Sequence, residues 1–146
     1  MILQTQRLTK IYGEFHALNA VSMTLQQGDI YGLIGRNGAG KTTFFKCVMG
    51  LAVPTGGTIE INGETANLNA ARRQMGFMIT PSFFPYLNAK ENLEYLCRVK
   101  GINEKGKVKW LLKIVGLADV KKPFKAFSLG MKQRLGIAGA LLTSPP

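Results

Sequence analysis

A glycine-rich stretch that contains one lysine has the residue types and spacing of a phosphate-binding loop, G-x-x-x-x-G-K-[ST]. Its residues are Gly35, Arg36, Asn37, Gly38, Ala39, Gly40, Lys41, Thr42 and Thr43. The glycines allow successive backbone N–H groups to turn around a polyphosphate. Lys41 would supply positive charge to the β- and γ-phosphates, and the Thr42 hydroxyl is a hard oxygen ligand of the kind that Mg²⁺ prefers. The stretch therefore predicts binding of a nucleoside triphosphate with Mg²⁺.

Such a loop works only when neighbouring elements position it. Residues 29–34 read as a short buried strand before the loop, and residues 42–49 read as the opening of a helix after it. The phosphates would then lie at a helix N-terminus, where free N–H groups and the helix dipole favour anions.

The composition is that of one globular domain. The chain has 146 residues, of which 46% are hydrophobic, enough to bury a core. No apolar run approaches the length that spans a bilayer, and residues 1–10 lack the apolar centre of a signal peptide. Cys47 and Cys97 lie in helix-like segments, and we interpret them as reduced core residues.

The net charge of +11 is high for this length, and many of the lysines lie between residues 100 and 125. A nucleic acid or an anionic membrane surface would suit such a charge. A solvated basic helix face without a dedicated partner is the explanation that we prefer.

Strand patterns fill the first part of the chain. Residues 2–8 and 20–25 alternate in polarity, a third strand at 58–62 follows the turn 55–57, and Asn62-Gly63 closes that strand. Residues 75–79 are a short apolar run and predict a further strand.

Helix patterns fill the rest. Residues 67–74 suggest a short helix, and Asn88 with Glu91 forms a capping box that opens a helix ending at Gly101. An apolar stripe at residues 108–115 predicts a second helix, ended by Gly116, and Ser128 opens a third. Strands followed by helices around a phosphate loop indicate an α/β nucleotide-binding domain with an inserted helical part.

A second motif lies at residues 127–135, Phe-Ser-Leu-Gly-Met-Lys-Gln-Arg-Leu. Ser128 offers a hydroxyl, Gly130 an unobstructed N–H, and the helix behind them the positive end of its dipole. Such a group could contact a γ-phosphate. The candidate positions are Ser128, Leu129, Gly130 and Met131.

This motif resembles the signature of ATP-binding-cassette (ABC) ATPases, whose usual form is Leu-Ser-Gly-Gly-Gln, and its distance from the phosphate loop is also similar. Phe127, Leu129 and Met131 differ from the usual residues, whereas Ser128 and Gly130 match them. The resemblance implies a P-loop NTPase-like α/β fold with an antiparallel β subdomain and an inserted helical subdomain. It also implies that the signature acts in trans, in a homodimer or heterodimer of ATP-binding subunits.

The resemblance covers almost the whole chain. Residues 8–13 resemble the entry segment of the family, whose aromatic residue stacks on adenine, so Tyr12 is the candidate for this stack. The family also has a glutamine that ligates Mg²⁺ after a strand. Here Ile79 or Thr80 occupies that place, and neither offers a carboxamide. Among the branches of the family, the chain resembles most the antibiotic exporters of the bacitracin and lantibiotic type.

Residues Phe83 to Tyr86 occupy the region that receives the membrane-spanning permease subunit in this family. An exposed aromatic cluster would suit that partner, whereas a buried one would be a plug between subdomains. The resemblance implies a cytoplasmic location at the inner face of the cell membrane.

In the family, a strand that ends in Asp-Glu follows the signature helix, and a histidine that senses the γ-phosphate follows later. No carboxylate follows Asp119 in this sequence. We therefore expect the chain to be the N-terminal portion of an ABC ATPase domain, able to bind ATP but unable to hydrolyse it alone. We divide it into residues 1–66 (β-rich with the phosphate loop), 67–127 (strand, coupling region and helical subdomain) and 128–146 (signature helix).

Two further expectations follow. Strand edges that a whole domain would pair should be exposed, which predicts an oligomer or a rearranged core. The leading function is the ATP-binding subunit of an exporter of drugs or peptide antibiotics. The alternatives are a soluble ABC-type ATPase acting on nucleic acid or ribosomes, although we expect no nucleic-acid partner, and a remnant that only binds nucleotide.

Overall fold

The computed structural model describes residues 1–79, 82–103 and 106–144. It contains two compact units, Met1–Arg73 and Gln74–Pro146. Among the described residues, no helix is both long enough and apolar enough to cross a membrane.

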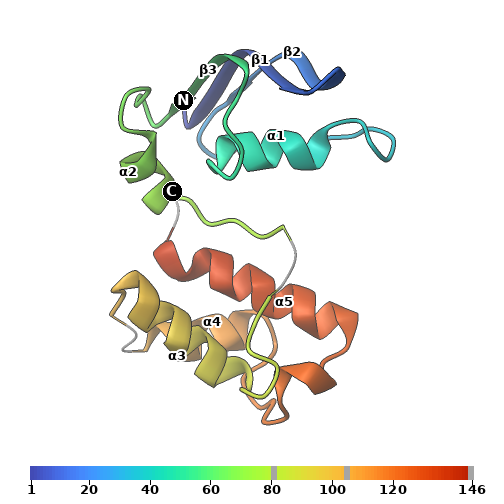
Figure 1. The fold of residues 1–146 in the computed structure, drawn as a ribbon. Coiled ribbons are helices and arrows are strands. Elements are labelled where there is room, and N and C mark those ends of the chain that lie inside the picture. The colour runs from blue at the N-terminus through green and yellow to red at the C-terminus, as the bar shows by residue number, and fades with distance from the viewer. Residues whose placement is uncertain (80–81, 104–105, 145–146) are drawn as a thin grey trace. The chain divides into compact units, whose positions relative to one another are not determined.

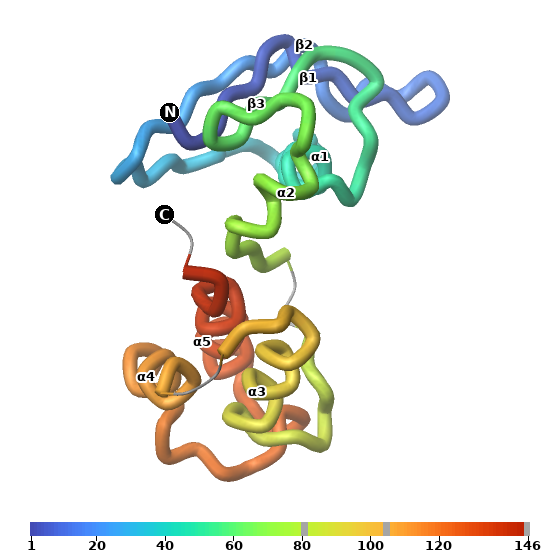
Figure 2. Tube along the Cα trace, turned by 90° about the vertical axis from the view of Figure 1, so that its left-hand side faces the viewer, coloured from blue at the N-terminus to red at the C-terminus, as the bar shows by residue number. Residues whose placement is uncertain are grey.

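The first unit is built on a three-stranded antiparallel sheet in the order β2-β1-β3. Its strands are β1 (Leu3–Tyr12), β2 (Phe15–Leu25) and β3 (Gly56–Ile61). Helix α1 (Lys41–Val48) lies along one face of this sheet and contacts β2, and the short helix α2 (Leu68–Arg73) follows β3 (Figures 1 and 2). The strands expected at residues 2–8, 20–25 and 58–62 are thus confirmed, with longer bounds for the first two.

Two short turns set the register of this sheet. Asn62 and Gly63 both have positive φ, 52° and 82°, and Ile61 and Glu64 exchange backbone hydrogen bonds of 3.0 and 2.9 Å across them. An Asn-Gly pair favours this geometry, as the sequence predicted. Between β1 and β2, a two-residue turn that begins with Gly13 brings Tyr12 opposite Phe15.

The core of the first unit lies between the sheet and α1. It contains Leu8, Leu18 and Ile61 from the strands, and Phe44 and Cys47 from the helix, all buried. Burial raises the pKa of the Cys47 thiol, and the Lys10 ammonium opposes this rise, so the group stays a neutral core thiol at pH 7. Both cysteines are free and buried, as expected.

The second unit is a helical bundle of α3 (Ala89–Lys100), α4 (Lys107–Ile114) and α5 (Leu129–Ala140), with the 3-10 helices η1 (Phe124–Ala126) and η2 (Leu141–Thr143). Fully buried leucines from all three α-helices form its centre: Leu93, Leu111 and Leu135. The three helices pack on one another (Figure 1).

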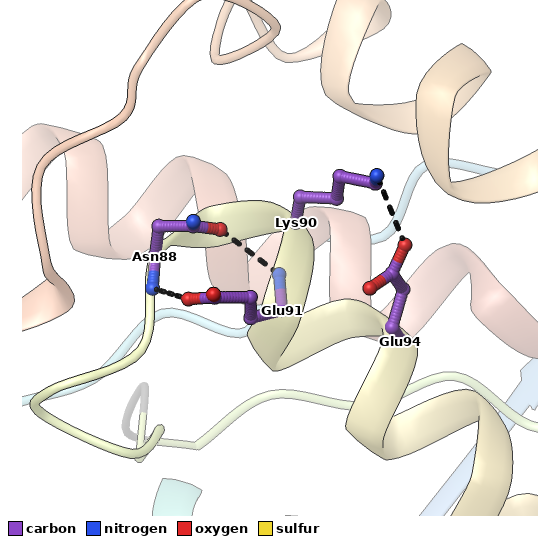
Figure 3. A network of polar contacts seen from close by, with 4 residues as sticks. All are labelled: Asn88, Lys90, Glu91 and Glu94. Atoms are coloured by element: carbon purple, nitrogen blue, oxygen red, sulfur yellow. Dashed lines mark hydrogen bonds and ion pairs between the residues drawn. The ribbon is translucent and has the colours of Figure 1, made fainter.

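The start of α3 is confirmed in detail. The Asn88 side chain accepts from the Glu91 N–H at 3.0 Å, and the Glu91 carboxylate accepts from the Asn88 N–H at 2.8 Å (Figure 3). Gly101 ends the helix in the left-handed conformation. In the first turns of α3, Lys90 forms an ion pair with Glu94 at 3.4 Å (Figure 3). Because the lysine is exposed, this pair contributes little to stability.

Two strand predictions are wrong. Residues 29–34 form no strand. Ile30 and Ile34 are essentially fully exposed, with exposed fractions of 102% and 96%. Residues 75–79 also form no strand, and Phe77 is about half exposed. Both runs have strand-like composition, but no strand of the described chain pairs with either, and an unpaired apolar run has no ladder to hold it extended.

Candidate functional site

The phosphate loop ends where α1 begins, as predicted. Gly40 is the N-cap of α1 with φ 87°, and no side chain caps the helix. The first turn of α1 carries no acidic residue. Its N–H groups therefore keep their capacity to bind an anion, and the positive end of the helix dipole adds to the attraction.

Lys41 lies folded over this loop. Its ammonium donates hydrogen bonds to the carbonyl oxygens of Gly35 at 2.5 Å and Arg36 at 2.8 Å. Among the described residues that line the loop cavity, Lys41 is the only cation, and these bonds hold its ammonium at the phosphate end. A phosphate oxygen could replace either carbonyl as the acceptor, with a stronger, charge-assisted bond.

A cavity of about 330 Å³ lies beside the loop. Of the described residues that line it, none is acidic, and the polar side chains all come from the loop and the start of α1. The lining consists of Phe15, Ala17, Asn37, Gly38, Ala39, Gly40, Lys41, Thr42 and Thr43. The cavity thus joins a polar, positively charged end to an aromatic end provided by β2.

The aromatic end differs from the expectation. Tyr12, the expected adenine stack, is about half exposed at the end of β1 but does not line the cavity. Phe15, which the sequence reasoning missed, is 61% exposed and does line it. The available signal was the two-residue turn after Tyr12, because such a turn places the third following residue directly opposite.

Close backbone contact fixes the loop against the sheet. A Cβ on Gly40 would lie 2.2 Å from the Ala17 carbonyl oxygen, so only glycine fits there. At the other end of α1, the Arg72 guanidinium donates to the carbonyls of Val48 at 2.8 Å and Cys47 at 3.3 Å. The guanidinium cation interacts favourably with the negative end of the α1 dipole, and its hydrogen bonds join α1 to α2.

The second motif opens α5. The Ser128 hydroxyl accepts from the Met131 N–H at 3.3 Å and so caps the helix, as expected. Leu129 is 71% exposed, and a Cβ on Gly130 would meet nothing within 4 Å. Met131 instead packs partly against the core of its unit. The helix start is therefore open at Leu129 and Gly130, as an approaching ligand would require.

The segment Phe83 to Tyr86 combines the two interpretations that the sequence left open. Phe83 packs inward, with its ring centroid 5.3 Å from that of Phe124. Phe84 and Tyr86 are exposed, 48% and 77%, and Phe84 packs edge-to-face on Tyr95 at 4.6 Å. A cavity of about 180 Å³ lies among Ser82, Phe83, Phe84, Pro85, Asn92, Tyr95 and Leu96.

Asn92, also missed from the sequence, holds this segment. Its side chain is 1% exposed; its oxygen accepts from the Phe84 N–H at 2.8 Å, and its nitrogen donates to the carbonyls of Phe84, Leu87 and Asn88 at 3.0–3.1 Å. A buried amide that satisfies four backbone groups fixes the loop shape.

Of the two positions proposed for the missing glutamine, only Ile79 is described, and its side chain offers no metal ligand. Ile79 is an exposed apolar residue, and Thr80 lies outside the described residues. No cluster of His, Cys, Asp or Glu that could hold a metal occurs in the described part of the chain. Thr42, on the cavity wall, could serve as a protein ligand. Because Mg²⁺ usually takes only one or two protein ligands and completes its shell with phosphate and water, this residue fits a nucleotide-bound ion.

Comparison with known proteins identifies the family. A family model described as ABC transporter matches residues 18–146. The bacitracin transport ATP-binding protein BcrA of Bacillus licheniformis is 46% identical over 99% of this chain and 48% of its own length. The lantibiotic transport ATP-binding protein SrtF of Streptococcus pyogenes is 40% identical over 99% of this chain and 63% of its own. The chain thus spans about half the length of the first of these relatives.

Solved structures agree. The ATP-binding subunit of an ABC transporter superposes with a TM-score of 0.85 at 31% identity, covering 100% of this chain and 64% of that one. A dimeric ATP-binding cassette in a post-hydrolysis state with ADP and phosphate superposes with a TM-score of 0.85 at 27% identity. This match covers 99% of this chain and 71% of that one. The fold is that of an α/β P-loop nucleotide-binding domain, with its antiparallel β part and its helical part. The chain belongs to the ABC transporter family, in the branch related to the bacitracin and lantibiotic transport proteins.

Proposed function

We propose that this chain binds ATP with Mg²⁺ at the N-terminus of α1 and belongs to the ATP-binding subunit of an exporter of drugs or peptide antibiotics. Two relatives named for the transport of bacitracin and of lantibiotics, each covering 99% of this chain, support the export role. The single observation that carries ATP binding is the uncapped start of α1, with Lys41 folded over the loop beside an open cavity.

Each loop residue has a part in binding. The first-turn N–H groups of α1 and the loop amides would take the phosphate oxygens, and Lys41 would exchange its carbonyl partners for them. Thr42 would hold Mg²⁺, which supplies charge neutralisation between the β- and γ-phosphates. Tyr12 would stack on the adenine.

Residues 1–146 would bind ATP without hydrolysing it. Transfer of the γ-phosphoryl group to water needs an oriented nucleophile as well as a phosphate clamp. No carboxylate follows Asp119 in this sequence, and the only histidine, His16, precedes the loop. Of the described residues that line the loop cavity, none is acidic or a histidine, so no base adjoins the phosphate end there.

The open start of α5 supports a role in trans. Ser128 and Gly130 would contact the γ-phosphate held by a second ATP-binding subunit, because a Cβ-free backbone N–H and a dipole end are accessible there. Exposed Phe84 and Tyr86, with the cavity beside Tyr95, would receive the permease subunit at the inner face of the membrane.

The test is ATP binding to the purified chain by calorimetry with Mg²⁺, in wild type and in Lys41→Ala. We expect the substitution to weaken binding at least tenfold, because a charge-assisted bond to phosphate contributes about 1.5–3 kcal/mol. Lys46→Ala is the matched control, since Lys46 lies exposed in the last turn of the same helix. Equal affinity of the Lys41→Ala variant and the wild type would contradict the proposal.

The net charge of +11 supports the second candidate function, an ABC-type ATPase acting on nucleic acid. Binding of the same chain to RNA with an affinity that falls steeply with salt would favour it, because neutralised phosphates release counterions. We expect no such binding, since the two transport proteins compared above match almost the whole chain.

A further inference from the structure

The basic residues of this chain are unevenly distributed. Residues 74–146 contain twelve of the nineteen lysines and arginines but four of the eight acidic residues, a net charge of +8. Residues 1–73 contain the other seven basic and four acidic residues, a net charge of +3. In the described part of the second unit, Lys90 and Glu94 form the one ion pair, so most of the lysines there have no acidic partner.

Helix α4 has two faces of different character. Its inward face packs Val108, Leu111 and Leu112 into the core of the bundle. At 3.6 residues per turn, the opposite face carries four exposed residues: Lys109, Trp110, Lys113 and Ile114. Residues three and four apart on a helix are neighbours, so these four side chains form one continuous patch, which we call the outer face of α4.

The apolar part of the outer face is large. Trp110 is 58% exposed and Ile114 is 54% exposed, and they lie one helical turn apart. The indole has a broad apolar ring and one N–H donor, a combination that favours the boundary between lipid headgroups and acyl chains. The sequence alone favoured a solvated basic face, and the exposed Trp110 and Ile114 beside the lysines are what the structure adds.

We propose that the outer face of α4 binds the anionic lipids of a membrane surface. Lys109 and Lys113 would contact the charged headgroups, and Trp110 and Ile114 would enter the headgroup boundary, as the apolar residues of interfacial helices do. Charge complementarity selects an anionic surface, because the unit that carries this face has a net charge of +8. The inference goes beyond the proposed function, since lipid contact requires neither nucleotide nor permease.

A nucleic acid fits the outer face less well. Both of its cations are lysines, whereas recognition of nucleic acid favours the bidentate guanidinium of arginine. Ile114 has no π-face on which a base could stack, but it adds apolar area for contact with lipid. Arg134, elsewhere in the unit, already donates to the carbonyls of Val115 at 3.2 Å and Gly116 at 3.4 Å. The observations therefore favour lipid.

Trp110 is the only tryptophan in the sequence, so its fluorescence reports directly on the outer face. The experiment mixes the purified chain with vesicles of phosphatidylcholine that contain about 30% phosphatidylserine, and with vesicles of phosphatidylcholine alone. We expect the anionic vesicles to shift the emission to shorter wavelength and to quench it when their acyl chains are brominated. The neutral vesicles should do neither, and added salt should weaken the binding.

The double variant Lys109→Gln, Lys113→Gln should bind the anionic vesicles about thirtyfold more weakly, because each basic residue near such a surface strengthens binding about fivefold. Lys109→Arg, Lys113→Arg keeps the charge and should retain the affinity. Lys46→Gln, Arg73→Gln is the matched control: it removes the same charge from exposed positions of the first unit and should leave the affinity nearly unchanged. Circular dichroism checks that each variant is folded.

Three results would overturn the proposal. The first is an unchanged Trp110 emission with anionic vesicles. The second is an equal loss of affinity in the Lys109, Lys113 double variant and in the control, which would mean that net charge alone attracts the chain. The third is tighter binding of single-stranded RNA than of anionic vesicles, with the same shift of Trp110 emission, which would make the outer face a nucleic-acid site.

Discussion

At the scale of single residues, the Asn92 side chain holds the backbone of the segment that carries the exposed Phe84 and Tyr86. It is fully buried in α3 and satisfies four backbone groups of residues 84–88. We expect Asn92→Ala to lower the free energy of unfolding by about 2–3 kcal/mol. It leaves the Phe84 N–H without its partner and removes one hydrogen bond from each of three carbonyls, which keep only their backbone donors. Urea unfolding followed by circular dichroism measures this loss.

Asn88→Ala is the comparison for this prediction. It removes only the cap of α3, where the exposed N–H groups can turn to water, and should cost about 1 kcal/mol. If Asn92→Ala costs no more than Asn88→Ala, the buried amide does not hold the segment. The same variant should also alter the exposed position of Phe84, and with it the proposed permease contact.

At the scale of elements, Gly40 decides whether the phosphate loop can rest on β2. Gly38 and Gly40 both have positive φ, 84° and 87°, so alanine at either position costs about 1–2 kcal/mol of backbone strain. Only at Gly40 would the new Cβ also meet a backbone oxygen, that of Ala17 at 2.2 Å; at Gly38 nothing lies within 4 Å.

Gly40→Ala should therefore lower the unfolding free energy by clearly more than Gly38→Ala, because α1 must move away from the sheet to relieve the clash. Urea unfolding without nucleotide measures both variants and avoids any contact between the new methyl groups and phosphate. Equal losses would mean that the loop adjusts locally and that its contact with β2 does not position it.

Elements whose signal is local could be predicted from the sequence, and elements that depend on a distant partner could not. The capping box at Asn88 and the turn at Asn62-Gly63 have their partners within three residues, and both are confirmed. Residues 29–34 and 75–79 have the composition of strands but no neighbouring strand in the described chain. A strand is defined by pairing, which composition does not specify.

The candidate site also has parts that local sequence predicts and parts that it does not. The helix that follows the phosphate loop has a local pattern, and the sequence placed it to within one residue, with α1 starting at Lys41. Phe15 and Asn92 were missed because their roles arise from packing: a cross-strand register for the first, and carbonyls of a folded-back loop for the second. The turn after Tyr12 was the one local sign of the register.

At the scale of the whole molecule, the exposed run at residues 29–34 conflicts with the high net charge. Ile30 and Ile34 present apolar side chains beside unpaired backbone, which favours pairing between chains. The charge of +11 opposes any association of like molecules. At 0.15 M, salt screens the repulsion between charges that lie more than about 8 Å apart and leaves apolar contact intact, so the balance should shift with ionic strength.

We therefore expect the purified chain to self-associate, more at 0.5 M salt than at 0.05 M, as measured by light scattering over a range of concentrations. The double variant Ile30→Asp, Ile34→Asp should reduce association without loss of stability, because neither side chain is buried. Val99→Asp is the control: Val99 is 66% exposed, but its backbone is bonded within α3, so it offers no edge for pairing. A monomer at all salt concentrations, with slow hydrogen exchange at residues 30–34, would show that this segment is paired within one chain.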